Sequence, residues 1–114
     1  MLKEILSKFL ILNGVQAAVL VQENGEIIES IKSGIRIDGG MQEAISTLML
    51  DSKATAAGFG NAPPTLFVEY ADYLIIIGPV MEEFYLLLIA KTSANIGQIT
   101  YEMKKNREAI VSLL

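Results

Sequence analysis

The stretch that decides the fold is Thr65 to Lys91, TLFVEYADYLIIIGPVMEEFYLLLIAK. It holds three strand-like runs, Thr65 to Tyr70, Tyr73 to Val80 and Phe84 to Lys91, which lie almost back to back. The first run alternates in polarity, which is typical of an amphipathic strand at the edge of a sheet. The other two are apolar on both faces, as central strands between two layers are. Pro79 removes a ladder donor and predicts a bulge or a strand end.

The most apolar part of this stretch, Tyr73 to Ala90, has 18 residues and approaches the length of a membrane helix. Gly78-Pro79 interrupts it, and Glu82-Glu83 would place two carboxylates near its middle. Each charge at the centre of a membrane costs roughly 2.5–3.5 kcal/mol. Two strands and a turn explain the same residues without that cost, so we expect no membrane insertion.

The chain before this block predicts a helix and a hairpin. Apolar residues recur at helical spacing over residues 2–12, and Asn13-Gly14 supplies a left-handed stop. Two strands, Val15 to Gln22 and Glu26 to Ile31, follow on either side of Asn24-Gly25. That dipeptide is a strong signal for a two-residue hairpin, because both positions tolerate positive φ.

A second and a third helix flank the block of strands. The second begins near Met41 with Asp38 as a candidate N-cap, and it stops near Gly58 or Gly60. Ala62-Pro63-Pro64 then forms a linker that cannot be helical. The third helix runs over residues 94–114, with Ser93 or Asn95 as its cap.

The predicted order of elements is therefore α-β-β-α-β-β-β-α. This order predicts one α/β (α+β) sandwich, in which one helix covers one face of a five-stranded antiparallel sheet and two helices cover the other. With 114 residues the chain is long enough for one domain, 1–114, and too short for two. Hydrophobic residues make up 52% of it, and such surplus apolar surface on a small chain favours burial against a second copy.

Several classes of function are excluded by the composition. The chain has no cysteine and no histidine, so thiolate and imidazole metal sites and Cys or His nucleophiles are absent. The net charge is −4, and the one tight basic group, Lys104, Lys105 and Arg107, is interpreted as a solvated helix face rather than a nucleic-acid site. Glu82 and Glu83 are adjacent in a turn and point apart, which disfavours paired acid–base work. We therefore expect no catalytic residue, no metal and no cofactor.

The start of the chain carries no export signal, because MLKEILSKFLILNG has charges inside its apolar pattern and no small-residue cleavage site. The expected compartment is the cytoplasm. The glycine-rich segment GIRIDGG, residues 34–40, lacks the Lys and Ser/Thr of a phosphate-binding loop. Nucleotide binding by the chain itself is therefore not expected.

Four stretches together resemble the Roadblock/dynein-light-chain-seven domain, in particular its short MglB-like members from bacteria and archaea. They are LNGVQAAVLVQENGEIIES at residues 12–30, the helix Met41 to Ala57, the block Thr65 to Lys91, and AKTSANIGQITYEMKK at residues 90–105. The last is the most specific, because it is similar to the small-Asn-aliphatic-Gly opening of the family's final helix. The likeness covers almost the whole chain and implies a roadblock/profilin-like fold.

The resemblance implies a homodimer in which the edge strand Thr65 to Tyr70 pairs with its copy and the two middle helices lie side by side. The apolar residues of the middle helix are either ordinary core or part of this seam, and we expect some of each. In the edge strand, Phe67 and Glu69 fit a dimer seam better than a ligand site. The predicted dimer residues are Met41, Ile45, Leu48, Met49, Thr65, Phe67 and Glu69.

Members of this family bind small Ras-like GTPases, as activators, co-regulators or scaffolds, so the resemblance implies such a partner. The candidate contact face is the side of the middle helix away from its apolar stripe. It comprises Gln42, Glu43, Ser46, Thr47, Leu50 and Lys53. Neither of the two arginines, Arg36 and Arg107, lies on this helix, so we expect regulation by positioning of the GTPase's own residues, without an arginine finger and without catalysis by this chain.

Two other functions are compatible with the same residues. One is a structural adaptor of the dynein-light-chain or Ragulator kind, which holds an assembly together without changing nucleotide turnover. The other is a small-ligand sensor, because profilin-like and longin-like sandwiches share the architecture and fold does not determine function.

Overall fold

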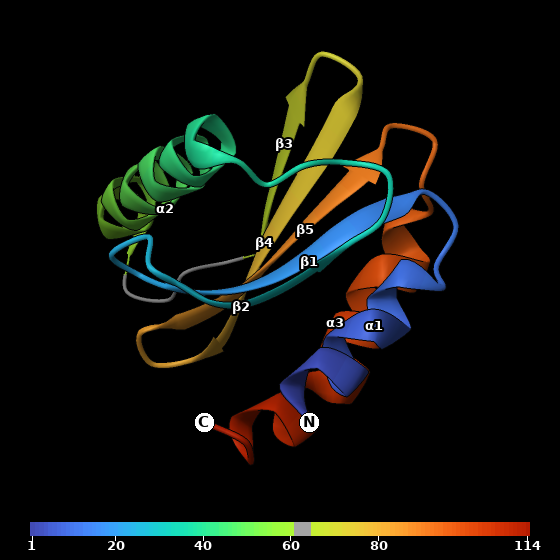
Figure 1. Ribbon diagram of the computed structural model, residues 1–114. Coiled ribbons are helices and arrows are strands. Elements are labelled where there is room, and N and C mark those ends of the chain that lie inside the picture. Colours follow the sequence, from blue (N-terminus) through green and yellow to red (C-terminus); the bar gives the residue numbers. More distant parts are fainter. Residues whose placement is uncertain (61–64) are drawn as a thin grey trace.

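The computed structural model describes residues 1–60 and 65–114 (Figure 1). Its elements follow the predicted order of helix, hairpin, helix, three strands and helix. Their bounds are α1 Leu2–Leu10, β1 Val15–Gln22, β2 Ile27–Lys32, α2 Gly39–Phe59, β3 Leu66–Tyr70, β4 Tyr73–Met81, β5 Phe84–Lys91 and α3 Ile96–Val111. The predicted linker Ala62-Pro63-Pro64 lies outside the described residues.

The five strands form one antiparallel sheet, as the sequence predicted, and the structure places them in the order β2-β1-β5-β4-β3. β5 lies at the centre, and its residues 86–90 are all buried. The two edges are β2 and β3. The pairing of β4 with β5 shifts register between Pro79 and Met81, which is the irregularity that Pro79 predicted.

α2 covers one face of the sheet, and α1 and α3 cover the other (Figure 1). Ile45 and Met49 of α2 pack with residues such as Leu87 in one core cluster. Leu6 of α1 and Ile99 of α3 belong to the cluster on the opposite face. The predicted sandwich, with one helix on one side and two on the other, is confirmed.

The apolar run that approached the length of a membrane helix forms β4 and β5 instead. Successive residues of β5 alternate between the two core clusters, with Leu86 and Leu88 on the α1–α3 side and Leu87 and Ile89 on the α2 side. This burial on both faces explains why the run shows no polar alternation. Within residues 1–60 and 65–114, no helix is both long and apolar enough to cross a membrane.

The start of α2 is determined by a side-chain cap. Asp38 Oδ1 accepts a hydrogen bond from the Met41 amide at 3.0 Å, as predicted for an N-cap. The helix therefore begins at Gly39, slightly before the predicted start. It ends at Phe59, where Gly60 adopts a φ of 124° that glycine tolerates.

The start of α3 is determined in the same way. Asn95 Oδ1 accepts from the Gln98 amide at 3.0 Å, so Asn95, and not Ser93, is the cap. As a result α3 begins at Ile96 and ends at Val111, inside the range that the sequence predicted.

The β1–β2 turn packs directly against α2. Gly25 in this turn has a φ of +91°, and a Cβ built on it would lie 2.7 Å from the Cα of Ser46. Only glycine satisfies both the positive φ and the close approach of the two backbones. The Asn24-Gly25 signal therefore marks a tertiary contact as well as a hairpin.

This contact predicts a specific loss of stability. Gly25→Ala is expected to lower the free energy of unfolding by about 1–3 kcal/mol, because a side chain there is strained and collides with α2. Urea unfolding at fixed protein concentration measures the change. The matched control is Gly58→Ala in α2, where a Cβ meets nothing within 4 Å. That variant is expected to gain about 0.5–1 kcal/mol, and equal stability of the two variants would contradict the packing of the turn.

Candidate functional site

The edge strand β3 is the least protected element of the sheet. It pairs only with β4, and the structure of residues 1–60 and 65–114 places no strand on its other side. Residues 66–70 contain no lysine and no proline, which are the usual guards of an exposed edge. Its outward amide and carbonyl groups are therefore open to pairing with another strand.

The two faces of β3 differ in chemistry. Leu66, Val68 and Tyr70 lie on the α2 side, because they pair with residues such as Ile75 and Ile77 that pack against α2. Phe67 lies on the α1–α3 side, opposite Ile76. The same alternation places Thr65 and Glu69 beside Phe67. Tyr70 is 72% exposed and Phe67 46%, so each face of the strand presents an aromatic ring to solvent.

An apolar groove of about 680 Å³ runs between α2 and β3. Its floor is formed by β3, β4 and β5, and its wall by the first half of α2. The lining residues are Gly40, Met41, Glu43, Ala44, Thr47, Leu48, Val68, Tyr70, Tyr73, Ile75 and Ile89. Three residues of this wall, Gly40, Ala44 and Thr47, have small side chains. A second helix could therefore approach α2 closely along this groove.

The predicted dimer residues of α2 divide into two groups. Ile45 and Met49 are each 1% exposed and pack in the protein's own core, so they present no surface to another molecule. Met41 and Leu48 are half-buried and line the groove. Helical spacing could not distinguish the two core residues from the two groove residues, because all four lie on one stripe of the helix. The distinction appears only in the structure, where β3 lies beside one flank of α2.

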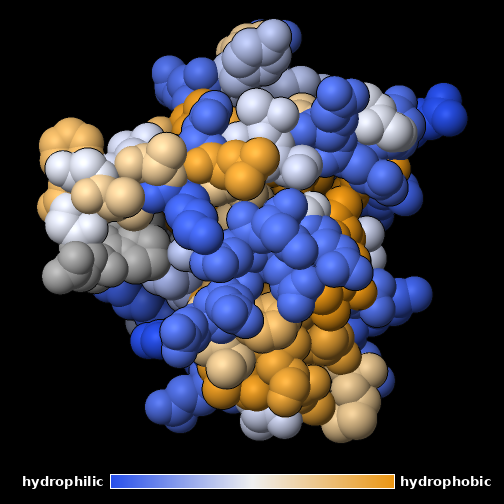
Figure 2. All heavy atoms as spheres, turned by 90° about the vertical axis from the view of Figure 1, so that its left-hand side faces the viewer, coloured by the Kyte–Doolittle hydropathy of each residue, from blue (hydrophilic) through white to orange (hydrophobic). Residues whose placement is uncertain are grey.

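The predicted GTPase-contact residues also divide. Gln42 and Leu50 are exposed away from the groove, and Leu50 is 56% exposed. Glu43 and Thr47 are also exposed, but they line the groove beside β3. Figure 2, which views the molecule from the α2 side, shows hydrophilic residues across the middle of this face and hydrophobic groups above and below it. The outer side of α2 is thus a mixed surface with one large apolar side chain.

Ser46 and Lys53 lie on the flank of α2 that faces the β1–β2 hairpin. Ser46 is beneath the turn at Gly25, and the Lys53 ammonium forms an ion pair of 3.2 Å with Glu23 in that hairpin. The pair is largely exposed and contributes only about 0.2–1 kcal/mol. The β1–β2 turn is therefore part of the same surface as α2, and no local sequence signal joins Glu23 to Lys53.

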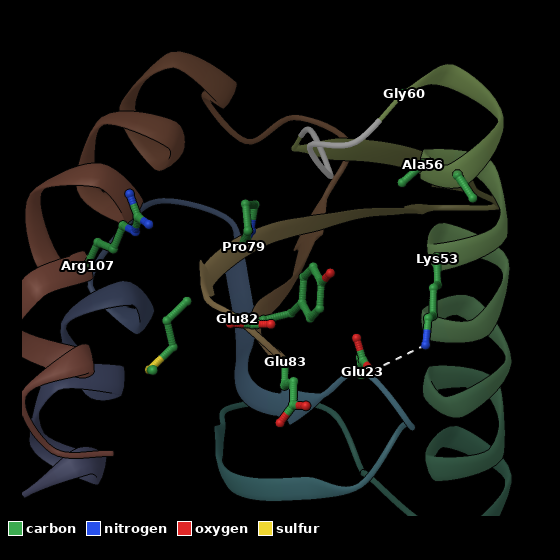
Figure 3. A pocket seen from close by; sticks show the side chains of 11 residues that line it. Glu23, Lys53, Ala56, Gly60, Pro79, Glu82, Glu83 and Arg107 are labelled. Atoms are coloured by element: carbon green, nitrogen blue, oxygen red, sulfur yellow. Dashed lines mark hydrogen bonds and ion pairs between the residues drawn. The ribbon is translucent and has the colours of Figure 1, made fainter.

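A polar hollow of about 590 Å³ lies beyond this ion pair, between the last turns of α2 and the β4–β5 hairpin (Figure 3). Burial raises the pKa of the Tyr85 hydroxyl above its ordinary 10.0; the nearby Glu23 carboxylate adds to the rise, and Lys53 opposes it. Glu82 and Glu83 also line the hollow. Among the described residues, no group of three acidic side chains is arranged to hold a metal ion.

Neither of the two arginines is on α2. Arg36 is exposed in the loop before the helix. Arg107 is on α3, on the other side of the sheet, and its Nε donates to the carbonyl oxygen of Val80 at 2.7 Å. Figure 3 shows Arg107 across the hollow from Lys53 and α2.

Comparison with known proteins identifies the fold. No protein-family model matches the sequence, and no curated protein matches it as a relative. Solved structures do match. A Roadblock/LC7 domain from Streptomyces avermitilis superposes with a TM-score of 0.82 at 14% identity, covering 96% of this chain and 94% of that one.

Two MglB structures match similarly. The gliding protein MglB from Thermus thermophilus has a TM-score of 0.79 at 18% identity, covering 95% of this chain and 84% of that one. An MglB with a tetrameric arrangement has a TM-score of 0.79 at 17% identity, with coverages of 95% and 83%. The chain therefore has the Roadblock/LC7 fold, in the form found in MglB.

Proposed function

We propose that the chain forms a homodimer through β3 and α2, and that the dimer binds a small Ras-like GTPase through the outer sides of its two α2 helices. The observation that carries the proposal is the unguarded edge of β3 beside an apolar groove. A second β3 supplies the missing hydrogen-bond partners, and the α2 that accompanies it covers the groove. Self-association is also a property of one structural neighbour, the MglB with a tetrameric arrangement.

The dimer creates a surface that one copy lacks. A two-fold axis beside β3 brings the two α2 helices together, with Met41 and Leu48 turned toward the seam and Leu50 left on the outer side. Two copies of Leu50, each next to exposed polar residues, then form one mixed surface across the dimer. The β1–β2 turn, held to α2 by Gly25 and the Glu23–Lys53 pair, extends this surface.

The regulatory action follows from which GTPase conformation the surface binds best. A surface that binds one nucleotide state more tightly shifts the GTPase toward that state, whereas equal binding to both states shifts nothing. The chain thus acts as a regulator that is not itself an enzyme. Equal affinity for the GDP and GTP forms would instead assign the chain as an adaptor.

One prediction of this proposal concerns dimerisation. Ala44→Lys places a charge in the apolar groove, where the monomer leaves it in solvent and the dimer would bury it. The dissociation constant of the dimer is expected to rise at least about thirtyfold, as measured by sedimentation equilibrium. Ala109→Lys, on an exposed position of α3, is the matched control and should leave the dimer intact. An unchanged dimer with Ala44→Lys would contradict assembly through the groove.

The second prediction concerns the GTPase. Leu50→Glu is expected to weaken binding of the partner GTPase about tenfold or more while leaving the dimer intact, because Leu50 is the large apolar side chain on the outer side of α2. Calorimetry with the GDP and GTP forms measures the loss. Ile11→Glu, at an 83% exposed site after α1, is the control. If both variants bind like the wild type, the partner uses another face.

The third prediction concerns the arginines. Arg36→Ala is expected to change GTP hydrolysis by the bound GTPase less than about threefold, because Arg36 lies outside the α2 surface. An arginine finger would contribute about 10³–10⁵-fold. A single-turnover hydrolysis assay at saturating protein decides between these values. A loss of a hundredfold or more would assign Arg36 to the GTPase site and overturn the proposed mode of action.

A further inference from the structure

A second, smaller hollow lies on the face of the sheet opposite α2, where β3, β4 and α3 meet. Its volume is about 160 Å³, enough for several water molecules and therefore for a carboxylate group. It is lined by Thr65, Gly78, Pro79, Thr100, Met103, Lys104 and Arg107. Two cations and two hydroxyl groups thus surround a small space directly beside the exposed edge of the sheet.

The cations of this hollow have no carboxylate partner among residues 1–60 and 65–114. In the described residues the one ion pair joins Lys53 to Glu23, so neither Lys104 nor Arg107 has a carboxylate partner. Arg107 is also held in place, because its Nε donates to the Val80 carbonyl at 2.7 Å. A guanidinium that is fixed by one nitrogen and has its others free is prepared to bind an oxyanion.

Gly78 lines the hollow where β4 meets α3. A Cβ at this position would lie 2.6 Å from Met103 Cε and 3.5 Å from Thr65 Oγ1. Its backbone does not need positive φ, so the requirement here is space between β4 and α3. The glycine therefore allows Met103 of α3 to pack directly against β4, beside Thr65.

A complementary carboxylate lies on the same face of the same strand. Glu69 is exposed, pairs with Leu74 across the β3–β4 ladder and therefore points to the α1–α3 side. Within the described part of the chain it makes no ion pair. It lies toward the end of β3 away from Thr65, so its own chain does not bring it to Lys104.

We infer that a second copy fills the hollow: β3 pairs antiparallel with its own copy about an axis through Phe67, and the partner's Glu69 binds between Lys104 and Arg107. In this register Thr65 is directly opposite the partner's Glu69, and directly opposed Cβ atoms are about 4.5–5.5 Å apart. The inference rests on the proposed dimer and specifies its register. Symmetry produces two such ion pairs, one on either side of a Phe67–Phe67 pair.

A neighbouring register of the β3–β3 pairing places fewer side chains opposite a suitable partner. Antiparallel pairing keeps like faces together only when the axis passes through a residue, because side chains alternate along each strand. An axis at Val68 would place the Glu69 carboxylate opposite the Phe67 ring and leave Thr65 without an opposing residue in the strand. An axis at Phe67 instead pairs two half-exposed rings and both carboxylates with cations.

Charge reversal tests the ion pair. Glu69→Lys and Lys104→Glu are each expected to raise the dissociation constant of the dimer roughly three- to thirtyfold, and the double variant should return it to near the wild-type value. Lys105→Glu is the matched control, since it makes the same charge change on α3 outside the hollow. Lys104 and Glu69 are both exposed, so the monomer is expected to fold in every variant.

Each outcome of the charge-reversal experiment either supports or overturns the inferred ion pair. If Lys104→Glu behaves like Lys105→Glu, or the double variant stays as weak as the single ones, the inference is overturned while the dimer stands. A wild-type chain that is monomeric at all concentrations overturns the dimer as well. Recovery in the double variant supports the register.

Single cysteine substitutions test the register of the β3–β3 pairing directly, because the chain has no cysteine of its own. Phe67→Cys places two thiols opposite each other on the axis, and mild oxidation should link the copies rapidly. Val68→Cys should link them more slowly. The reverse order would place the axis at Val68 and overturn the inference.

Discussion

The constraint on which the rest of this structure depends is the row of unpaired backbone groups along β3. The other edge of the sheet is managed differently: α1 lies against β2, and the β1–β2 ladder carries a register shift between Leu20 and Val21 that twists it. β3 has neither device, and neither helix layer extends far enough to cover it. The open edge of β3 is therefore the basis of the proposed dimer.

The residues on the two faces of β3 determine which molecule fits this open edge. On the α2 side, an apolar groove lies between α2 and β3, and Gly40, Ala44 and Thr47 are small residues in its α2 wall. On the α3 side, Glu69 near one end of β3 and Lys104 and Arg107 of α3 near its other end form no ion pair among the described residues. Apolar area supplies the stabilisation of an interface, and placed charges supply its register and orientation. A chain of net charge −4 that keeps two cations beside this edge is complementary to its own Glu69.

Much of the fold could be predicted from local patterns. Alternation in Thr65 to Tyr70 indicated an edge strand, unbroken hydrophobicity indicated central strands, and Asp38 was recognised as a helix cap. These signals work because burial imposes a period of two or of 3.6 residues on the chain. The candidate site was less predictable. The helical stripe of α2 grouped the core residue Ile45 with the groove residue Leu48, and periodicity cannot tell burial in a core from burial in a groove.

The sequence by itself thus determined the order of elements, the layers of the sandwich and the amphipathic strand at the edge, since each leaves a period of burial that can be recognised within a short segment. Only the tertiary structure decided which side chains share a surface. Glu23 meets Lys53 and Arg107 meets Val80 across about thirty residues of chain. Such pairs obey no fixed spacing, because their separation in sequence depends on the lengths of the intervening loops. The close packing of Gly25 on Ser46 and of Gly78 on Met103 was likewise visible only after the helices had docked on the sheet.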